Sequence, residues 1–192
     1  MNKTRLEAFS DAVIAIIMTI MVLELKVPHG ADLESLTPLL PVFLSYVLSF
    51  VYLGIYWNNH HHMLQATRKV NGKVLWANLN LLFWLSLFPF ATGWMGDSHF
   101  ATIPTATYGL VLLLAAIAYS ILQRTIVKHE KDENALLAAA IGNDTKGKIS
   151  MVCYAAAVPL AFVSPWISGA LYVFVAALWF IPDRRIEKVF YK

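Results

Sequence analysis

The chain has 192 residues, of which 58% are hydrophobic and only 14% are charged, and its formal net charge is +3. This composition is typical of an integral membrane protein. It excludes a separate soluble domain, because no long polar segment is available to form one, and we expect residues 1–192 to form a single membrane domain.

Six apolar segments follow one another, at residues 8–25, 39–57, 74–94, 105–127, 149–164 and 166–182. Most of them approach the roughly 20 residues that a helix needs to cross a bilayer. The last two are shorter and only Pro165 separates them, so a tight hairpin of tilted helices is an alternative there. The sequence predicts an all-α, polytopic membrane protein with six transmembrane helices.

The first apolar segment begins in a polar cluster. Arg5, Phe9, Ser10 and Asp11 form the pattern R-x-x-x-F-S-D, and twelve uncharged residues follow before Glu24. Ionisable groups at membrane depth are costly and usually mark a functional or architectural site. Ser10 or Asp11 as a simple helix cap is the alternative. Because Arg5 and Asp11 are six residues apart and do not share a helical face, we expect each to find partners on other helices.

One face of this first helix carries a stripe of five residues. Helical spacing brings together Ala12, Ile16, Thr19, Ile20 and Leu23. From periodicity alone, the stripe is a packing face against a neighbouring helix, and Thr19 bonds a backbone carbonyl one turn back.

The second and third segments offer partners for the polar cluster. The candidates are Trp57, His60, His61, His62, Asn78 and Asn80. Three consecutive histidines resemble metal ligands, but neighbouring helical residues point about 100° apart and no Cys, Asp or Glu is close in sequence. We therefore expect no metal site and no cofactor, and a structural hydrogen-bond role for one or two of the histidines.

Basic residues fall on alternate sides of the predicted spans. All but one of the fifteen Lys and Arg lie at the termini or in alternate connections, and Lys26 is the exception. The positive-inside rule then places both termini in the cytosol of a multi-pass protein of the cell membrane. Orientation explains the basic residues, and acidic residues are mixed among them near Glu130, so no nucleic-acid partner is expected.

These residues together resemble a known family. The motif Arg5-x-x-x-Phe9-Ser10-Asp11-Ala12, then Ala15-Ile16 and Thr19, Trp57 with His60 and His61, and Asn80 with Pro89-Phe90 are similar to the prokaryotic branch of the lysosomal potassium channel family, also called the transmembrane protein 175 family. The resemblance covers essentially the whole chain. Departures are modest: Ala12 stands where many relatives have Gly, and His62 extends the histidine pair.

The resemblance implies a potassium channel in the lipid bilayer, built as a homotetramer around the first helix. Rings of Ile16, Ile20 and Leu23 would form the narrow pore, with Thr19 as a polar layer between them. The stripe found from periodicity is the same set, so the resemblance changes its interpretation from packing face to pore lining. No T-V-G-Y-G filter is present. We expect moderate potassium selectivity, because potassium holds its water less tightly than sodium and Thr19 hydroxyls replace only part of it.

Carboxylates are expected near both ends of this pore. Glu24, with Asp32 and Glu34, would lie by the extracellular mouth, where fourfold repetition raises the local cation concentration. Asp11 lies near the inner mouth, and we expect it to be a structural partner in the helix network rather than a pore charge.

Two other function classes stay open on the sequence. A proton or metal-ion transporter would use Asp11 and the histidines as a relay. A membrane enzyme or haem protein would be built on His60, His61, His62 and His99, but the chain shows no converging nucleophile or acid–base set. We therefore expect no enzyme.

Overall fold

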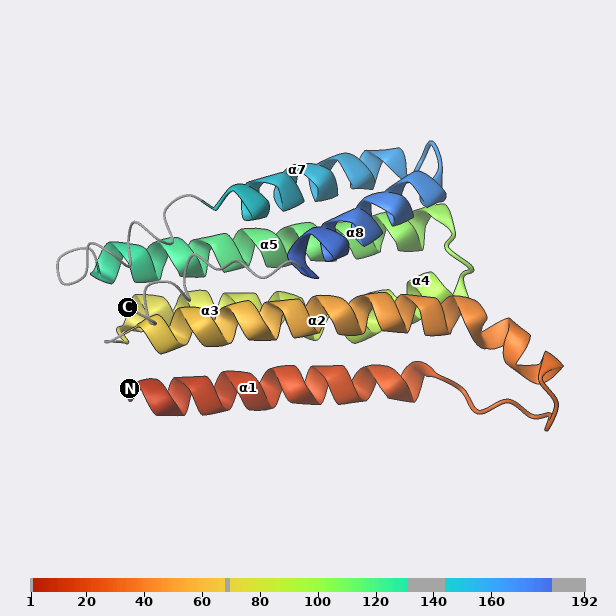
Figure 1. Cartoon of the computed structure of the whole chain (residues 1–192), viewed down its shortest axis with the longest axis horizontal. Helices are drawn as coiled ribbons and strands as arrows, with labels where there is room; N and C mark the ends of the chain where they lie inside the picture. Colours follow the sequence, from red (N-terminus) through yellow and green to blue (C-terminus); the bar gives the residue numbers. More distant parts are fainter. Residues whose placement is uncertain (1, 68–69, 131–143, 181–192) are drawn as a thin grey trace.

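The computed structural model describes residues 2–67, 70–130 and 144–180, and its regular structure there is helical (Figure 1). The elements in chain order are α1 (Lys3–Ile20), the 3-10 turn η1 (Met21–Glu24), the 3-10 helix η2 (Glu34–Leu39), α2 (Leu40–Ala66), α3 (Gly72–Ser86), α4 (Phe88–Asp97), α5 (Thr102–Glu130), α7 (Thr145–Leu160) and α8 (Pro165–Phe180).

Four stretches of the described residues are long and apolar enough to cross a membrane. They are Lys3–Glu24, Glu34–Gln65, Gly72–Asp97 and Thr102–Lys128, and they correspond to the first four predicted segments. The other two predicted segments correspond to α7 and α8, which have 16 residues each. The all-helical membrane fold is present, and the count of six spans stays a prediction.

The N-terminal end of α1 differs from the sequence prediction. The helix begins at Lys3, five residues before the predicted start, and the Asn2 side chain caps it by accepting a hydrogen bond from the Thr4 N–H at 3.2 Å. Ser10 and Asp11 therefore lie inside the helix, and the capping interpretation of these two residues is wrong.

The third predicted segment is two helices rather than one. Pro89 has no N–H group and its ring clashes with the carbonyl four residues back, so a continuous helix is disfavoured here. The chain makes a single turn at Leu87, whose N–H bonds the Trp84 carbonyl at 3.3 Å, and the Ala91 N–H then bonds the Leu87 carbonyl at 3.0 Å. The two helices continue in the same direction (Figure 1).

The second predicted segment is longer than expected. α2 continues nine residues beyond Trp57, to Ala66. Trp57 and all three histidines consequently lie on a regular helix, where successive side chains point in different directions.

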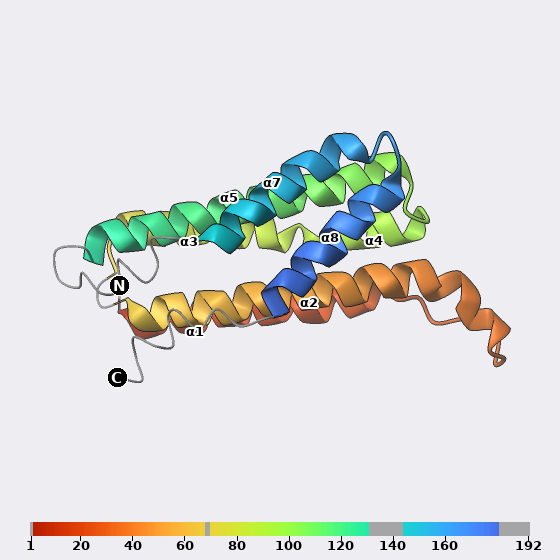
Figure 2. The ribbon, with the colours of Figure 1, turned by 45° about the horizontal axis from the view of Figure 1, so that its top comes forward.

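The helices pack as a bundle in which α1 forms one edge. It contacts α2, α3 and α4, while α5 packs on α3 and α7, and α8 crosses α2 obliquely (Figure 2). Buried tyrosines bind the outer helices to this core. The Tyr52 hydroxyl donates to the Tyr172 carbonyl at 2.6 Å, and the Tyr172 hydroxyl donates to the Thr105 carbonyl at 3.0 Å. Their hydroxyl groups are therefore paired in a region without water.

Candidate pore helix and its inner hydrogen-bond cluster

The two faces of α1 have opposite environments. Ile14 and Met21 are fully buried and Ile17 is nearly so, and these residues attach α1 to the rest of the subunit. The opposite face leaves Ile16 55% exposed, Ile20 42% exposed and Leu23 77% exposed. The stripe expected from helical periodicity is therefore an apolar face that the subunit itself does not cover.

Thr19 lies in the middle of this exposed face. Its hydroxyl donates to the Ile16 carbonyl at 2.9 Å, which is the predicted bond to the helix's own backbone. The proton is thereby directed along the helix, and the lone pairs of the oxygen remain available on the exposed side. A ring of such oxygens has the polarity that a passing cation requires.

The inner half of α1 is bound to α2 and α3 by a buried hydrogen-bond cluster. The Ser10 hydroxyl donates to the Leu6 carbonyl at 2.9 Å, and the Asn78 amide nitrogen donates to the Ser10 oxygen at 2.9 Å. The Asn78 amide oxygen faces His60 Nε2 at 2.7 Å. The three side chains are at most 1% exposed.

The direction of these bonds fixes the protonation pattern. Because Ser10 uses its proton on Leu6, it accepts from the Asn78 amide, and the Asn78 oxygen must then turn to His60. An amide oxygen only accepts, so His60 carries a proton on Nε2. His60 Nδ1 is buried and has no hydrogen-bond partner among the described residues. The cluster is directional and holds three helices at one level.

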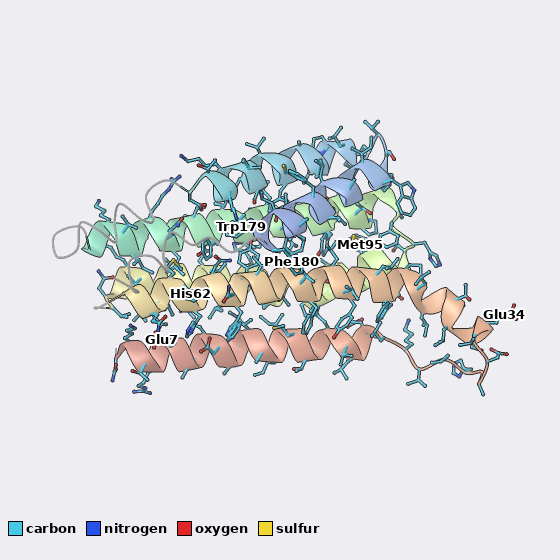
Figure 3. All side chains as sticks on the ribbon, viewed as in Figure 1. Glu7, Glu34, His62, Met95, Trp179 and Phe180 are labelled. Carbon is cyan, nitrogen blue, oxygen red and sulfur yellow. The ribbon has the colours of Figure 1, made fainter. Side chains whose placement is uncertain are left out.

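A second contact between α1 and α2 lies beside this cluster. The Trp57 indole N–H donates to the Asp11 carboxylate at 3.0 Å, and the Trp57 ring stacks on His61 with centroids 6.1 Å apart. Asp11 is half-buried and His61 is exposed. The first two helices are thus joined at their inner halves by an indole–carboxylate pair. Figure 3 marks this end by Glu7 on α1 and His62 on α2.

Comparison with known proteins identifies this arrangement. Residues 5–89 match the family model described as endosomal/lysosomal potassium channel TMEM175. A protein named potassium channel from Chryseobacterium sp. is 57% identical over 188 residues, which are 98% of this chain and 97% of that one. The chain belongs to the TMEM175 family.

Two further TMEM175 relatives extend this result. A protein named potassium channel from Streptomyces collinus is 31% identical over 175 residues, which are 85% of each chain. The crystal structure of a lysosomal potassium-selective channel TMEM175 homolog from Chamaesiphon minutus superposes with a TM-score of 0.79 at 27% identity, covering 94% of this chain and 97% of that one. The fold of this chain is therefore that of a prokaryotic TMEM175 protein.

Arg5 and Phe9 of the TMEM175-like motif are not bound within the subunit. Both are exposed, and the Arg5 guanidinium forms no hydrogen bond or ion pair with any residue that the structure describes. The expectation that Arg5 ties α1 to α2 or α3 of its own subunit is not met there. Lys3 makes that connection instead, because its ammonium donates to the Gln65 carbonyl at 2.7 Å and lies 3.8 Å from Glu7.

Asn80 was expected among the residues that join α1 to its neighbouring helices in this TMEM175 chain. In the structure, Asn78 makes the hydrogen bonds to Ser10 and His60. Positions 78 and 80 differ by about 200° around a helix, so only one of them faces α1. Asn78 shares its face with buried Val74, Leu81 and Leu85, whereas Asn80 shares its face with exposed Trp76. Apolar residues lie three and four positions from both asparagines in the sequence, so the structure and not the sequence identifies Asn78 as the buried one.

Glu24 ends η1, at the opposite end of α1 from the hydrogen-bond cluster, and its role as an outer-mouth carboxylate stays a prediction. Glu24 is exposed, and its carboxylate packs against α4 at Gly93. The approach is so close that a Cβ atom added at Gly93 would lie 2.9 Å from Glu24 Oε2. Nearby, Asp32 accepts hydrogen bonds from the Ser35 side chain and backbone, and these bonds lower the pKa of Asp32 below its usual value.

Histidine geometry gives little support to a metal site. Within residues 2–67, 70–130 and 144–180, no group of three or more His, Cys, Asp or Glu is arranged to hold an ion. His60 is buried, His61 is exposed and His62 is half-buried, so the three rings point in different directions.

The Asp11–Trp57 hydrogen bond predicts different losses of stability for two substitutions of Asp11 in this TMEM175 chain. Asp11→Ala removes the acceptor of the indole N–H, and because the pair is half-exposed we expect a loss of only about 1 kcal/mol in stability. Asp11→Asn keeps an acceptor oxygen and should lose less. Thermal unfolding followed by size-exclusion chromatography measures both. If Asp11→Ala and Asp11→Asn are equally stable and both lower the single-channel conductance, Asp11 is a pore charge instead.

Proposed function

We propose that this protein is a potassium channel, a homotetramer in which four α1 helices surround a central pore. Support comes from family membership and from two relatives named potassium channels. It is not an enzyme, since its family is one of ion channels. The observation that carries the pore assignment is the uncovered face of α1.

This face has the spacing of a helix-packing seam. Its exposed residues recur at intervals of four, three, four, three and four positions: Arg5, Phe9, Ala12, Ile16, Thr19 and Leu23. A repeat of this kind is the pattern of helices that pack side by side in bundles. Ala8, Ala12 and Ala15 are exposed on the same side, and such small residues let membrane helices approach closely. Both features favour neighbouring α1 helices over lipid as the partner.

The described interior of one subunit offers no alternative path. A route through it would need a continuous series of free polar atoms, yet the buried hydroxyls there, Thr105 excepted, bond each other or the backbone. Thr92 donates to Ser49 at 2.7 Å, and the Ser49 oxygen lies 2.9 Å from the Tyr108 hydroxyl. Among the described residues, the only buried side-chain polar atoms without a partner are His60 Nδ1 and Thr105 Oγ1, which belong to opposite halves of the bundle.

Conduction in the proposed tetramer depends on apolar rings. Fourfold rings of Ile16, Ile20 and Leu23 exclude water when narrow and admit it after a small dilation, so they act as gates. Side chains of this kind provide no oxygen atoms to replace ion hydration. Potassium loses its water more easily than sodium, and the Thr19 oxygens supply part of the coordination, so the preference for potassium is moderate.

Orientation follows from charge. The N-terminal ends of α1, α3 and α7 and the C-terminal end of α5 lie towards the left of Figure 1. These ends carry the cationic residues Lys3, Lys73, Lys148 and Arg124, whereas Lys26 follows η1 and pairs with Asp97, with Nζ and Oδ2 3.7 Å apart. The left end is then cytosolic. We infer six crossings in the cell membrane, with α7 and α8 as the last pair and both termini in the cytosol.

Flux through reconstituted liposomes tests the function. We expect passive potassium flux larger than sodium flux and no chloride flux, without a coupled substrate. Flux that requires a proton or metal gradient in fixed stoichiometry would identify a transporter instead. The mass of the purified protein in detergent tests assembly: four copies are expected, and a stable monomer would contradict the pore assignment.

A further inference from the structure

An open pocket of about 760 Å³ lies between α3 and α5 at the basic end of the bundle. Lys73, Trp76 and Asn80 line it from α3, and Ile121 and Thr125 line it from α5. It is separate from α1 and from the hydrogen-bond cluster of Ser10, Asn78 and His60, so the proposed channel mechanism does not use it.

The pocket has a charged mouth and a deeper polar group. Lys73, Trp76 and Asn80 follow one face of α3, three and seven positions apart, and Asn80 lies about 10 Å further along the helix than Lys73. α5 runs in the opposite direction, and its exposed Arg124 and Lys128 lie near the same end. Exposed cations of two helices therefore lie at the same end of the bundle, where the pocket opens.

Few acidic residues lie on the helices that carry this charge. The sequence of α3 contains no Asp or Glu, and that of α5 contains none before Glu130. Lys73, Arg124 and Lys128 form no ion pair with the residues of the described ranges. The mouth of the pocket is consequently a site of positive potential facing an apolar interior, which favours an anion with an apolar continuation.

Asn80 gives an independent reason to expect a ligand. Its amide is half-buried and makes no hydrogen bond with any residue that the structure describes. An amide without a partner at membrane depth is costly, so the free donor and acceptor of Asn80 favour a polar ligand in the pocket. Thr125 adds a second oxygen in the pocket: its hydroxyl donates to the Ile121 carbonyl at 2.7 Å and keeps its lone pairs.

We propose that this pocket binds an anionic phospholipid of the cytosolic leaflet. Lys73 and Arg124 bind the phosphate, the Asn80 amide bonds the glycerol ester region, and the acyl chains follow Ile121 towards the membrane interior. Trp76, which is 75% exposed, flanks the headgroup as interfacial tryptophans do. Basic pockets between membrane helices on this side recognise such headgroups. The proposal depends on the inferred orientation of the chain and not on the pore assignment.

Native mass spectrometry of the intact assembly tests the proposal. Delipidated protein is supplied with equal amounts of phosphatidylglycerol and phosphatidylcholine, and we expect preferential retention of one phosphatidylglycerol per subunit. Each removed cation should weaken retention about fivefold, so Lys73→Gln combined with Arg124→Gln should reduce it by about 25-fold. Asn80→Leu should reduce it without changing net charge. Lys148→Gln is the matched control, since Lys148 is an exposed cation at the same end on α7, and it should have no effect.

Several outcomes would overturn the proposal. Equal retention of the two lipids, or equal retention by the double variant and Lys148→Gln, would show that the pocket does not select an anionic headgroup. Competition by millimolar inorganic phosphate would identify a free anion as the ligand. Disulfide cross-linking between subunits through Trp76→Cys would show that another copy of the chain covers the pocket. Potassium flux measured on the same preparations keeps these outcomes separate from a failure of the proposed channel function.

Discussion

Replacing Ile16 with Asn should increase cation current severalfold and reduce the preference for potassium over sodium. Four branched side chains at this position exclude water from the proposed constriction, and four amides would keep it wet. The exposure of Ile16 in the single subunit means that the change introduces no buried polar group into the core. Liposome flux and bi-ionic reversal potentials measure the two effects.

Controls for this variant come from the other isoleucines. Ile117 is 38% exposed on α5, outside the seam, so Ile117→Asn should leave current and selectivity unchanged. Ile17 is only 4% exposed, so the same change there buries an amide and should reduce stability without opening the pore. If Ile16→Asn forms tetramers and leaves both current and selectivity unchanged, the exposed face of α1 is not the conduction path.

Thr19 allows a separate test of selectivity. Thr19→Val preserves shape but removes the oxygen that faces the seam. We expect a lower potassium-to-sodium permeability ratio with little change in stability, because the lost hydrogen bond was local to α1. An unchanged ratio would mean that the apolar rings alone determine selectivity.

Replacing Asn78 with Leu should destabilise the subunit more than any single change at its surface. The substitution leaves His60 Nε2 and the Ser10 hydroxyl without their partner in a buried site. Each unsatisfied group costs about 1–3 kcal/mol, so the total for the two groups is roughly 2–6 kcal/mol. We expect a clearly lower unfolding temperature and a smaller yield of assembled protein in detergent.

Asn58→Leu is the matched control for this change. Asn58 is an exposed amide on α2, two residues before His60, and its replacement should leave the unfolding temperature nearly unchanged. If Asn78→Leu is as stable as Asn58→Leu, the cluster does not hold the three helices together.

The exposed stripe of α1 was the most predictable part of the candidate site. Its residues follow from the 3.6-residue period and from the absence of charges between Asp11 and Glu24. Periodicity alone does not distinguish a face that packs on the same subunit from one that faces another copy, because both are apolar. The exposure of Ile16 and Leu23 removes the first possibility.

Local breaks and partner choice were harder to predict. Pro89 lies inside the predicted apolar segment 74–94, yet the helix is interrupted at Leu87 and the chain continues as another helix. A proline within an apolar run can end a span or divide it, and the length of the following helix decides between them. Asn78 and Asn80 were equally polar, and only the burial of their helical neighbours separates their roles.

The inner hydrogen bonds also determine how far each part of α1 moves when the helix tilts. Ser10 and Asp11 are hydrogen-bonded to side chains of other helices. Beyond Ile20 the chain continues as the 3-10 turn η1, where Met21 is buried and its sulfur lies 4.0 Å from the Thr92 hydroxyl. Ile16 lies about 9 Å from Ser10 along the axis and Leu23 about 20 Å. If α1 tilts as a rigid rod about the inner cluster, displacement grows in proportion to distance from the cluster, so one small tilt moves Leu23 about twice as far as Ile16. In the proposed tetramer, such a tilt would therefore displace the ring of Leu23 side chains further than the ring of Ile16 side chains.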